Sequence, residues 1–162
     1  MDRIALEELF NSADRDLNDG YFEAGVEKLE QILVEDPGFG KAYNHLGWLY
    51  ETKFQDYEKA EGYYKLALEH APNYAAVYTN FSILLSTLEK FDELEALLQK
   101  GLKVAGVNKG NIYYEYGIMY EKKGEFQKAI DQYRECAKST LNKNTLKNAT
   151  DSIERCSTKL NL

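Results

Sequence analysis

The residues in this sequence with chemistry suited to catalysis or metal binding are two histidines, two cysteines and several acidic clusters. His45 and His70 belong to no nucleophilic or metal-binding motif, and the spacing of Cys136 and Cys156 matches no zinc site. Acidic runs such as EELF and EKFDELE are typical of solvated helix faces. The glycines fall at turns and close helix contacts and form no phosphate-binding loop. We therefore predict no enzyme activity, no catalytic residue, no metal and no cofactor.

The charge of the chain is acidic overall and unevenly distributed. The net charge is −7, with −8 in residues 1–39, −1 in 40–74, zero in 75–109 and +2 in 110–162. An acidic chain without a basic face argues against nucleic acid and anionic membranes as partners. No apolar run reaches the roughly 18 residues that a membrane span needs, and the first residues do not resemble a signal peptide. The expected location is cytoplasmic.

The two cysteines are too few for a disulfide framework. We interpret Cys136 and Cys156 as small buried residues in a reducing compartment, with a disulfide between them as the alternative.

Small, aromatic and apolar residues recur along the chain at intervals of about 35 residues, which indicates an internal repeat. The small series is Ala13, Gly47, Ser82 and Gly117; the aromatic series is Phe22, Tyr57, Phe91 and Phe126; a third series is Leu29, Tyr64, Leu98 and Tyr133.

Each copy predicts two amphipathic helices, because its apolar residues recur at steps of three and four. Turn-forming runs such as NDG, DPGFG and APN separate them. The predicted helices are 6–19, 22–35, 40–53, 57–70, 75–88, 91–104, 110–123 and 126–139. A ninth helix at about 144–160 would cover the last repeat with Leu146, Ala149, Ile153, Cys156 and Leu160.

The second copy resembles a tetratricopeptide repeat, with Tyr43, Leu46, Gly47, Tyr50, Ala60, Tyr64 and Pro72 at the motif positions. The fourth copy resembles it nearly as closely, with Tyr113, Gly117, Tyr120, Gly124, Phe126, Ala129 and Tyr133. The first and third copies depart further from the pattern. The second and third copies carry one extra residue each, near 53–55 and 107–109.

The resemblance implies an all-α fold, a right-handed α-solenoid of four helix-turn-helix units (eight helices) plus a C-terminal capping helix. We expect a single domain over 1–162, with repeats at about 6–39, 40–74, 75–109 and 110–143.

The resemblance also implies a groove lined by the first helix of each repeat, and transfer of the family's lining positions by register predicts a peptide-binding surface. Its residues are Asn11, Asn44, His45, Trp48, Asn80, Ile83, Asn111, Tyr114 and Ile118. An asparagine amide can pair with a peptide backbone as donor or acceptor, and Trp48 and Tyr114 could be apolar anchors. Substitution Trp48→Ala is expected to abolish binding while helicity is retained.

Family members that grip the C-terminal carboxylate of heat-shock chaperones use a basic clamp, which this chain lacks. The matching positions read Phe10, Asp14, His45, Ala76 and Asn80 from the first copy, or Asn44, Trp48, Asn80, Asn111 and Glu115 from the second. We predict a non-enzymatic adaptor, scaffold or co-chaperone-like module that binds a protein segment. The alternative is a self-assembling solenoid, a head-to-tail or dimeric homo-oligomer that uses its charge-polarised ends.

Overall fold

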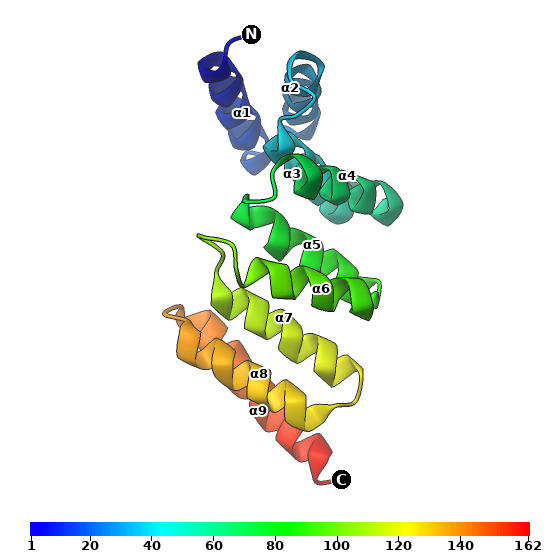
Figure 1. Ribbon diagram of the computed structural model, residues 1–162, viewed down its shortest axis with the longest axis vertical. Coiled ribbons are helices and arrows are strands. Elements are labelled where there is room, and N and C mark those ends of the chain that lie inside the picture. Colours follow the sequence, from blue (N-terminus) through cyan, green and yellow to red (C-terminus); the bar gives the residue numbers. More distant parts are fainter. The chain divides into compact units, whose positions relative to one another are not determined.

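The structure is a computed structural model that describes residues 1–162, and it contains nine α-helices, one π-helical segment and no strand (Figure 1). The helices are α1 Arg3–Asn18, α2 Phe22–Glu35, α3 Gly40–Leu49, α4 Tyr57–His70, α5 Ala75–Thr87, α6 Phe91–Gly101, α7 Lys109–Lys122, α8 Phe126–Ser139 and α9 Lys143–Leu160. The π-helical segment η1 is Tyr50–Phe54. The predicted all-α fold of four helix pairs and a C-terminal helix is confirmed.

The chain divides into two compact units, and each is described by itself. Unit 1 is Met1–Val77 and unit 2 is Tyr78–Leu162.

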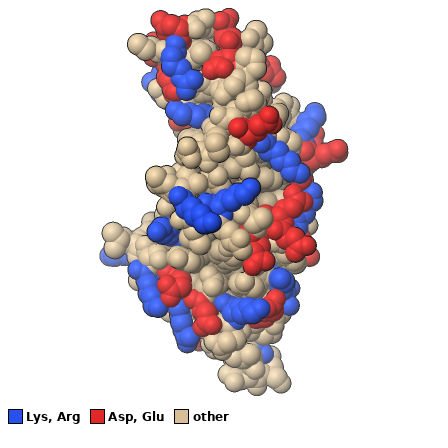
Figure 2. Space-filling model, viewed as in Figure 1, with Lys and Arg blue, Asp and Glu red and all other residues tan.

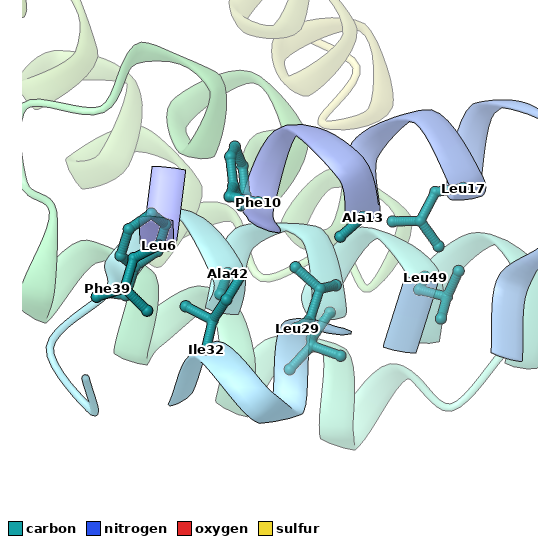
Figure 3. Packing of buried hydrophobic residues seen from close by; sticks show 10 residues of the cluster. Leu6, Phe10, Ala13, Leu17, Leu29, Ile32, Phe39, Ala42 and Leu49 are labelled. Atoms are coloured by element: carbon teal, nitrogen blue, oxygen red, sulfur yellow. The ribbon is translucent and has the colours of Figure 1, made fainter. Parts of the chain in front are cut away.

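The core of unit 1 is formed where α1, α2 and α3 meet. Figure 3 shows Phe10 and Leu17 of α1 with Leu29 of α2 and Leu49 of α3 in one buried cluster. Leu29 and Leu49 are fully buried. Because the apolar residues of each helix share one face, the helices pack in pairs, α1 with α2 and α3 with α4.

The small residue of the repeat allows its two helices to approach closely. A Cβ atom on Gly47 would lie 2.7 Å from the ring of Tyr64, and one on Gly117 would lie 2.4 Å from the ring of Tyr133. Both tyrosine rings are fully buried. The small series and the third series of the sequence, which contains Tyr64 and Tyr133, are therefore two sides of one helix–helix contact.

The extra residue of the second copy is absorbed by η1 in unit 1. Helix α3 ends at Leu49, and the wider turn of η1 carries the chain on to Phe54. Gln55 then adopts a left-handed conformation with φ 54°, and the Asp56 side chain accepts a hydrogen bond from the Lys59 backbone N–H at 3.2 Å, which caps α4. Phe54 is left 52% exposed.

In unit 2, α7 and α8 form a pair and α9 packs against both (Figure 1). The buried residues of α9 are Ala149, Ser152 and Cys156. The expectation that Leu146 and Leu160 cover the last repeat was wrong, because they are 44% and 49% exposed. Ala149 and Cys156 of the predicted face are buried and Ile153 packs against the cluster of Ala129, Ile130 and Tyr133, while Arg155 and Lys159 donate hydrogen bonds to Glu121 of α7.

The net negative charge of the chain comes from unit 1. Residues 1–77 contain 16 acidic and 7 basic residues, net −9, whereas residues 78–162 contain 11 and 13, net +2. On the face drawn in Figure 2, acidic and basic side chains lie side by side in mixed clusters.

Candidate functional site

A cleft of 250 Å³ lies among α5, α7 and α9 of unit 2. Its lining combines apolar and polar side chains, namely Thr79, Ile83, Asn111, Tyr114, Glu115, Thr145 and Asn148. Three of the predicted groove residues, Ile83, Asn111 and Tyr114, are therefore brought together at one place.

The two asparagines of the cleft have side-chain amides that no other residue of the chain engages. The Asn111 backbone N–H donates to Asn108 Oδ1 at 3.2 Å, which places the residue in the first turn of α7. Neither the Asn111 nor the Asn148 side chain forms a hydrogen bond within the chain. Each amide therefore offers a donor and an acceptor to a ligand.

The apolar part of the cleft is formed by Ile83 and Tyr114. Ile83 is 45% exposed. The Tyr114 ring is half-buried and packs 5.3 Å from the Tyr133 ring, centroid to centroid, and its hydroxyl lies 3.5 Å from Ser152 Oγ. Contacts with α8 and α9 thus hold the Tyr114 ring in place beside a partly exposed aliphatic side chain.

An ion-pair network centred on Glu121 holds α9, and with it one wall of the cleft. Arg155 Nε donates to Glu121 Oε1 at 2.8 Å and a terminal guanidinium nitrogen donates to Oε2 at 2.7 Å. Lys159 Nζ donates to Oε1 at 2.9 Å, and the Tyr133 hydroxyl donates to Oε2 at 3.0 Å. The Arg155 hydrogen bonds, with smaller help from Lys159 and Tyr133, hold the pKa of Glu121 well below its usual range.

Sequence reasoning missed Thr145 and Asn148, because α9 was interpreted only as a cap. The repeat register contains a signal that could have found them. A fifth copy begun at residue 144 would place Thr145 and Asn148 at the second and fifth positions, where Asn111 and Tyr114 stand in the fourth copy.

The remaining predicted residues of unit 2 do not line the cleft. Asn80 is half-buried on α5. Ile118 is half-buried on α7 and packs against the hydrophobic cluster of Ala129, Ile130 and Tyr133.

In unit 1, His45 joins α1 to α3. Its Nε2 lies 2.9 Å from Asp14 Oδ1, and its Nδ1 lies 3.1 Å from the Lys41 carbonyl oxygen. The imidazole also meets the Phe10 ring edge to face, with centroids 4.6 Å apart. The His45 side chain is 15% exposed, so most of its surface is used by contacts within unit 1.

The other predicted residues of unit 1 differ widely in exposure. Asn11 is exposed on α1. Asn44 is 2% exposed and does not present its amide to a ligand in this structure. Trp48 is half-buried and packs against the core of unit 1, and Lys53 Nζ lies 5.7 Å from its ring centroid.

The titratable groups form no arrangement suited to metal binding. No three or more His, Cys, Asp or Glu side chains converge as a metal site would require. Cys136 and Cys156 are both buried and free, and burial raises the pKa of both thiols, that of Cys156 to about 11. No helix has the length and apolar character that would let it cross a lipid bilayer.

The sequence matches one family model, the tetratricopeptide repeat, at residues 40–74 and 110–143. These are the two copies whose motif residues follow the family pattern most closely. No curated protein matches the chain.

Several solved structures share the fold. The crystal structure of MamA protein superposes with a TM-score of 0.79 at 19% identity, over 97% of this chain and 83% of that one. PilF of Pseudomonas aeruginosa superposes with a TM-score of 0.84 at 16% identity, over 97% of this chain and 69% of that one. PilW, a type IV pilus biogenesis factor, superposes with a TM-score of 0.75 at 16% identity, over 100% of this chain and 80% of that one.

These likenesses extend over nearly the whole chain, including the first and third copies that the family model does not match. Tetratricopeptide repeats are generally interaction modules. Residues 40–74 and 110–143 are therefore tetratricopeptide repeats, as their motifs predicted, and the chain has the α-solenoid fold of these solved structures.

Proposed function

We propose that the chain is a non-enzymatic protein–protein interaction module, an adaptor or scaffold, that binds a segment of a partner protein in the cleft of unit 2. The observation that carries the proposal is the pair of unengaged amides, Asn111 and Asn148, beside Ile83 and the fixed Tyr114 ring.

The cleft has the chemistry that a peptide segment requires. The amides of Asn111 and Asn148 pair with the N–H and C=O groups of a peptide backbone, and Ile83 with Tyr114 receives an apolar side chain. Glu115 lines the same cleft, and its carboxylate disfavours a terminal carboxylate as ligand, so the proposal is a segment within a partner chain.

The proposed binding surface contains only some of the predicted groove residues. Ile83, Asn111 and Tyr114 stay, and Thr145 and Asn148 of α9 are added. Asn44, Trp48 and Ile118 pack within the fold, so we assign their main role to stability. A cytoplasmic location stays a prediction. The two free, buried thiols are compatible with it.

The test is a capture experiment from native lysate with three forms of the chain. These are the wild type, the double variant Asn111→Ala/Asn148→Ala, and the control Gln31→Ala/Gln99→Ala, which removes two exposed amides outside the cleft. A partner held by the wild type and the control but lost by the cleft variant supports the proposal. Equal capture by all three forms contradicts it.

A second candidate function is self-assembly, which the charge difference between the units favours. Net charges of −9 and +2 would attract unlike ends of neighbouring copies. Multi-angle light scattering at low and high salt tests this candidate. Oligomers that dissociate as salt rises would support self-assembly, and a monomer at every salt concentration would contradict it.

A further inference from the structure

A second concavity, in unit 1, lies where the start of α2 meets η1. It has a volume of 460 Å³ and is lined by Gly20, Tyr21, Phe22, Glu23, Ala24 and Phe54; we call it the aromatic pocket. Its volume falls in the range of about 300–1,000 Å³ that is common for ligand sites. None of its residues belongs to the cleft of unit 2.

Two aromatic side chains of this pocket are largely exposed to solvent. Tyr21 is 66% exposed and Phe54 is 52% exposed, while most other aromatic rings of the chain are buried or half-buried. The Tyr21 hydroxyl forms no hydrogen bond within the chain. Exposed aromatic rings that line one concavity are typical of a recognition surface.

The backbone fixes the position of Phe54. The extra residue of the second copy creates η1, and Phe54 is the last residue of that segment. Its ring meets the Tyr50 ring at 5.1 Å, and the left-handed Gln55 and the capping Asp56 follow at once. The ring is therefore placed in the pocket before any ligand arrives, which lowers the entropic cost of binding.

The surroundings of the pocket suit a cation. Lys53 Nζ lies 5.0 Å from the centroid of Phe22 and 5.7 Å from that of Trp48, so a cation of the chain already occupies these two rings and the rings of Tyr21 and Phe54 are left for a ligand. The Glu23 carboxylate has no ion-pair or hydrogen-bond partner in the chain. Unit 1 as a whole has a net charge of −9.

We propose that the aromatic pocket binds an arginine or lysine side chain of a partner protein. The cation lies against the rings of Tyr21 and Phe54, and Glu23 accepts a hydrogen bond from it. Arginine is favoured over lysine, because the planar guanidinium stacks on a ring while its N–H groups reach the carboxylate.

The proposal is tested by NMR titration of ¹⁵N-labelled full-length chain with two short peptides. One is N-acetyl-Gly-Arg-Gly-amide, and the other contains citrulline, a neutral isostere, in place of arginine. We expect the arginine peptide to shift the amide signals of residues 20–24 and 54, with an association constant at least about fivefold above that of the citrulline peptide. Added salt should weaken the arginine peptide more.

Variants locate the site. Phe54→Ala, Tyr21→Ala and Glu23→Gln should each lower the association constant of the arginine peptide at least about threefold. Tyr57→Ala is the matched control, because Tyr57 is an aromatic residue, 38% exposed, that does not line the pocket. Circular dichroism establishes that each variant keeps its helicity.

Three results would overturn the proposal: equal binding of the arginine and citrulline peptides, arginine binding unchanged by Phe54→Ala and Tyr21→Ala, or shifts confined to residues of unit 2. Because the pocket and the cleft share no residue, Asn111→Ala/Asn148→Ala should leave the titration unchanged. Failure of the cleft proposal and failure of the pocket proposal can therefore be told apart.

Discussion

Arg155 of α9 donates two hydrogen bonds, of 2.8 and 2.7 Å, to the two carboxylate oxygens of Glu121 of α7, 34 residues earlier in the chain. This bidentate pair joins the last helix to the last repeat, and the Glu121 side chain is only 12% exposed. Thr145 and Asn148 of the same helix line the cleft.

Substitution Glu121→Gln should destabilise unit 2. Three donors, from Arg155, Lys159 and Tyr133, lose their charged acceptor, and a hydrogen bond to a charged group contributes about 1.5–3 kcal/mol. We expect the free energy of unfolding to fall by about 2 kcal/mol in urea titrations at pH 7. An unchanged urea concentration at the midpoint of unfolding would contradict this role of Glu121. The exposed substitution Glu154→Gln on α9 is the control.

The contribution of Glu121 should also depend on pH. The Arg155 hydrogen bonds lower the pKa of Glu121 in the folded state, so the unfolded state binds the proton more tightly. The stabilisation is then fully present above the unfolded pKa of about 4.3 and is lost as pH falls through the lower folded pKa. The gap in stability between wild type and Glu121→Gln should shrink below about pH 4. A gap that is constant from pH 7 to pH 3 would contradict the lowered pKa.

Glu51 occupies the same repeat position as Glu121, but we expect its pKa shift and its effect on stability to have the opposite direction. The Tyr64 hydroxyl donates to Glu51 Oε2 at 2.7 Å, as Tyr133 donates to Glu121, but no cation pairs with Glu51. Burial raises the pKa of Glu51. A raised folded pKa means that the folded state binds the proton more tightly, so this group adds stability as pH falls through the folded pKa.

We therefore expect Glu51→Gln to leave the free energy of unfolding unchanged or to raise it by up to about 1 kcal/mol at pH 7. The matched comparison with Glu121→Gln in the same urea titration checks this. A loss as large as that of Glu121→Gln would contradict it.

Adding one methyl group at Gly117 should be costly. The new Cβ would lie 2.4 Å from Cε1 of the fully buried Tyr133 ring, so the pair α7 and α8 must separate or the ring must turn. We expect a loss of about 1–3 kcal/mol for Gly117→Ala, measured by thermal or urea unfolding. The control is Gly62→Ala on α4, where no atom lies within 4 Å of the added Cβ and a gain of about 0.5–1 kcal/mol is expected. Equal effects of the two substitutions would show that Gly117 has no packing role.

The two thiols should be inert in the folded protein and report on the opening of α9. Cys136 and Cys156 are fully buried, and burial raises the pKa of both thiols. Labelling with a disulfide reagent should be slow in buffer and fast in denaturant. Glu121→Gln should speed the labelling of Cys156 on α9 more than that of Cys136 on α8, because it releases α9 first. Mass spectrometry of the labelled peptides separates the two sites, and equal acceleration at both would contradict this order.

Most of the fold could be predicted from the sequence, because local signals decide it. The helix pairs follow from the three- and four-residue apolar steps, and the contact of Gly47 with Tyr64 joins the small series to the third series. The face of α9 could also be predicted in its middle part, because Ala149 and Cys156 are buried and Ile153 packs against the cluster of Ala129, Ile130 and Tyr133. The two ends of that face could not be predicted, since Leu146 and Leu160 are 44% and 49% exposed, and Ser152 is buried on the same side of the helix.

The candidate site was only partly predictable, since register gives a residue's position and not what its side chain contacts. Trp48 stands at a groove position, yet it packs against the core because Lys53 and the neighbouring helices cover it. Phe54 lies exposed because a single extra residue opens η1, and no repeat motif describes that residue. Asn111 and Tyr114 do line the cleft, and the register of the fourth copy, which follows the family pattern closely, placed both on one side of the same helix; their part in binding stays a prediction.

The central claim is that the cleft of unit 2 receives a partner segment. The most direct measurement is photo-crosslinking with a benzophenone amino acid placed at position 148, at the wall of the cleft, or at position 158, which is exposed on the same helix but outside the cleft. The account predicts a crosslinked partner from position 148 that competes with unlabelled wild type, and none from position 158. Crosslinks from position 158 alone, or equal crosslinks from both, would place the binding surface elsewhere and contradict the account.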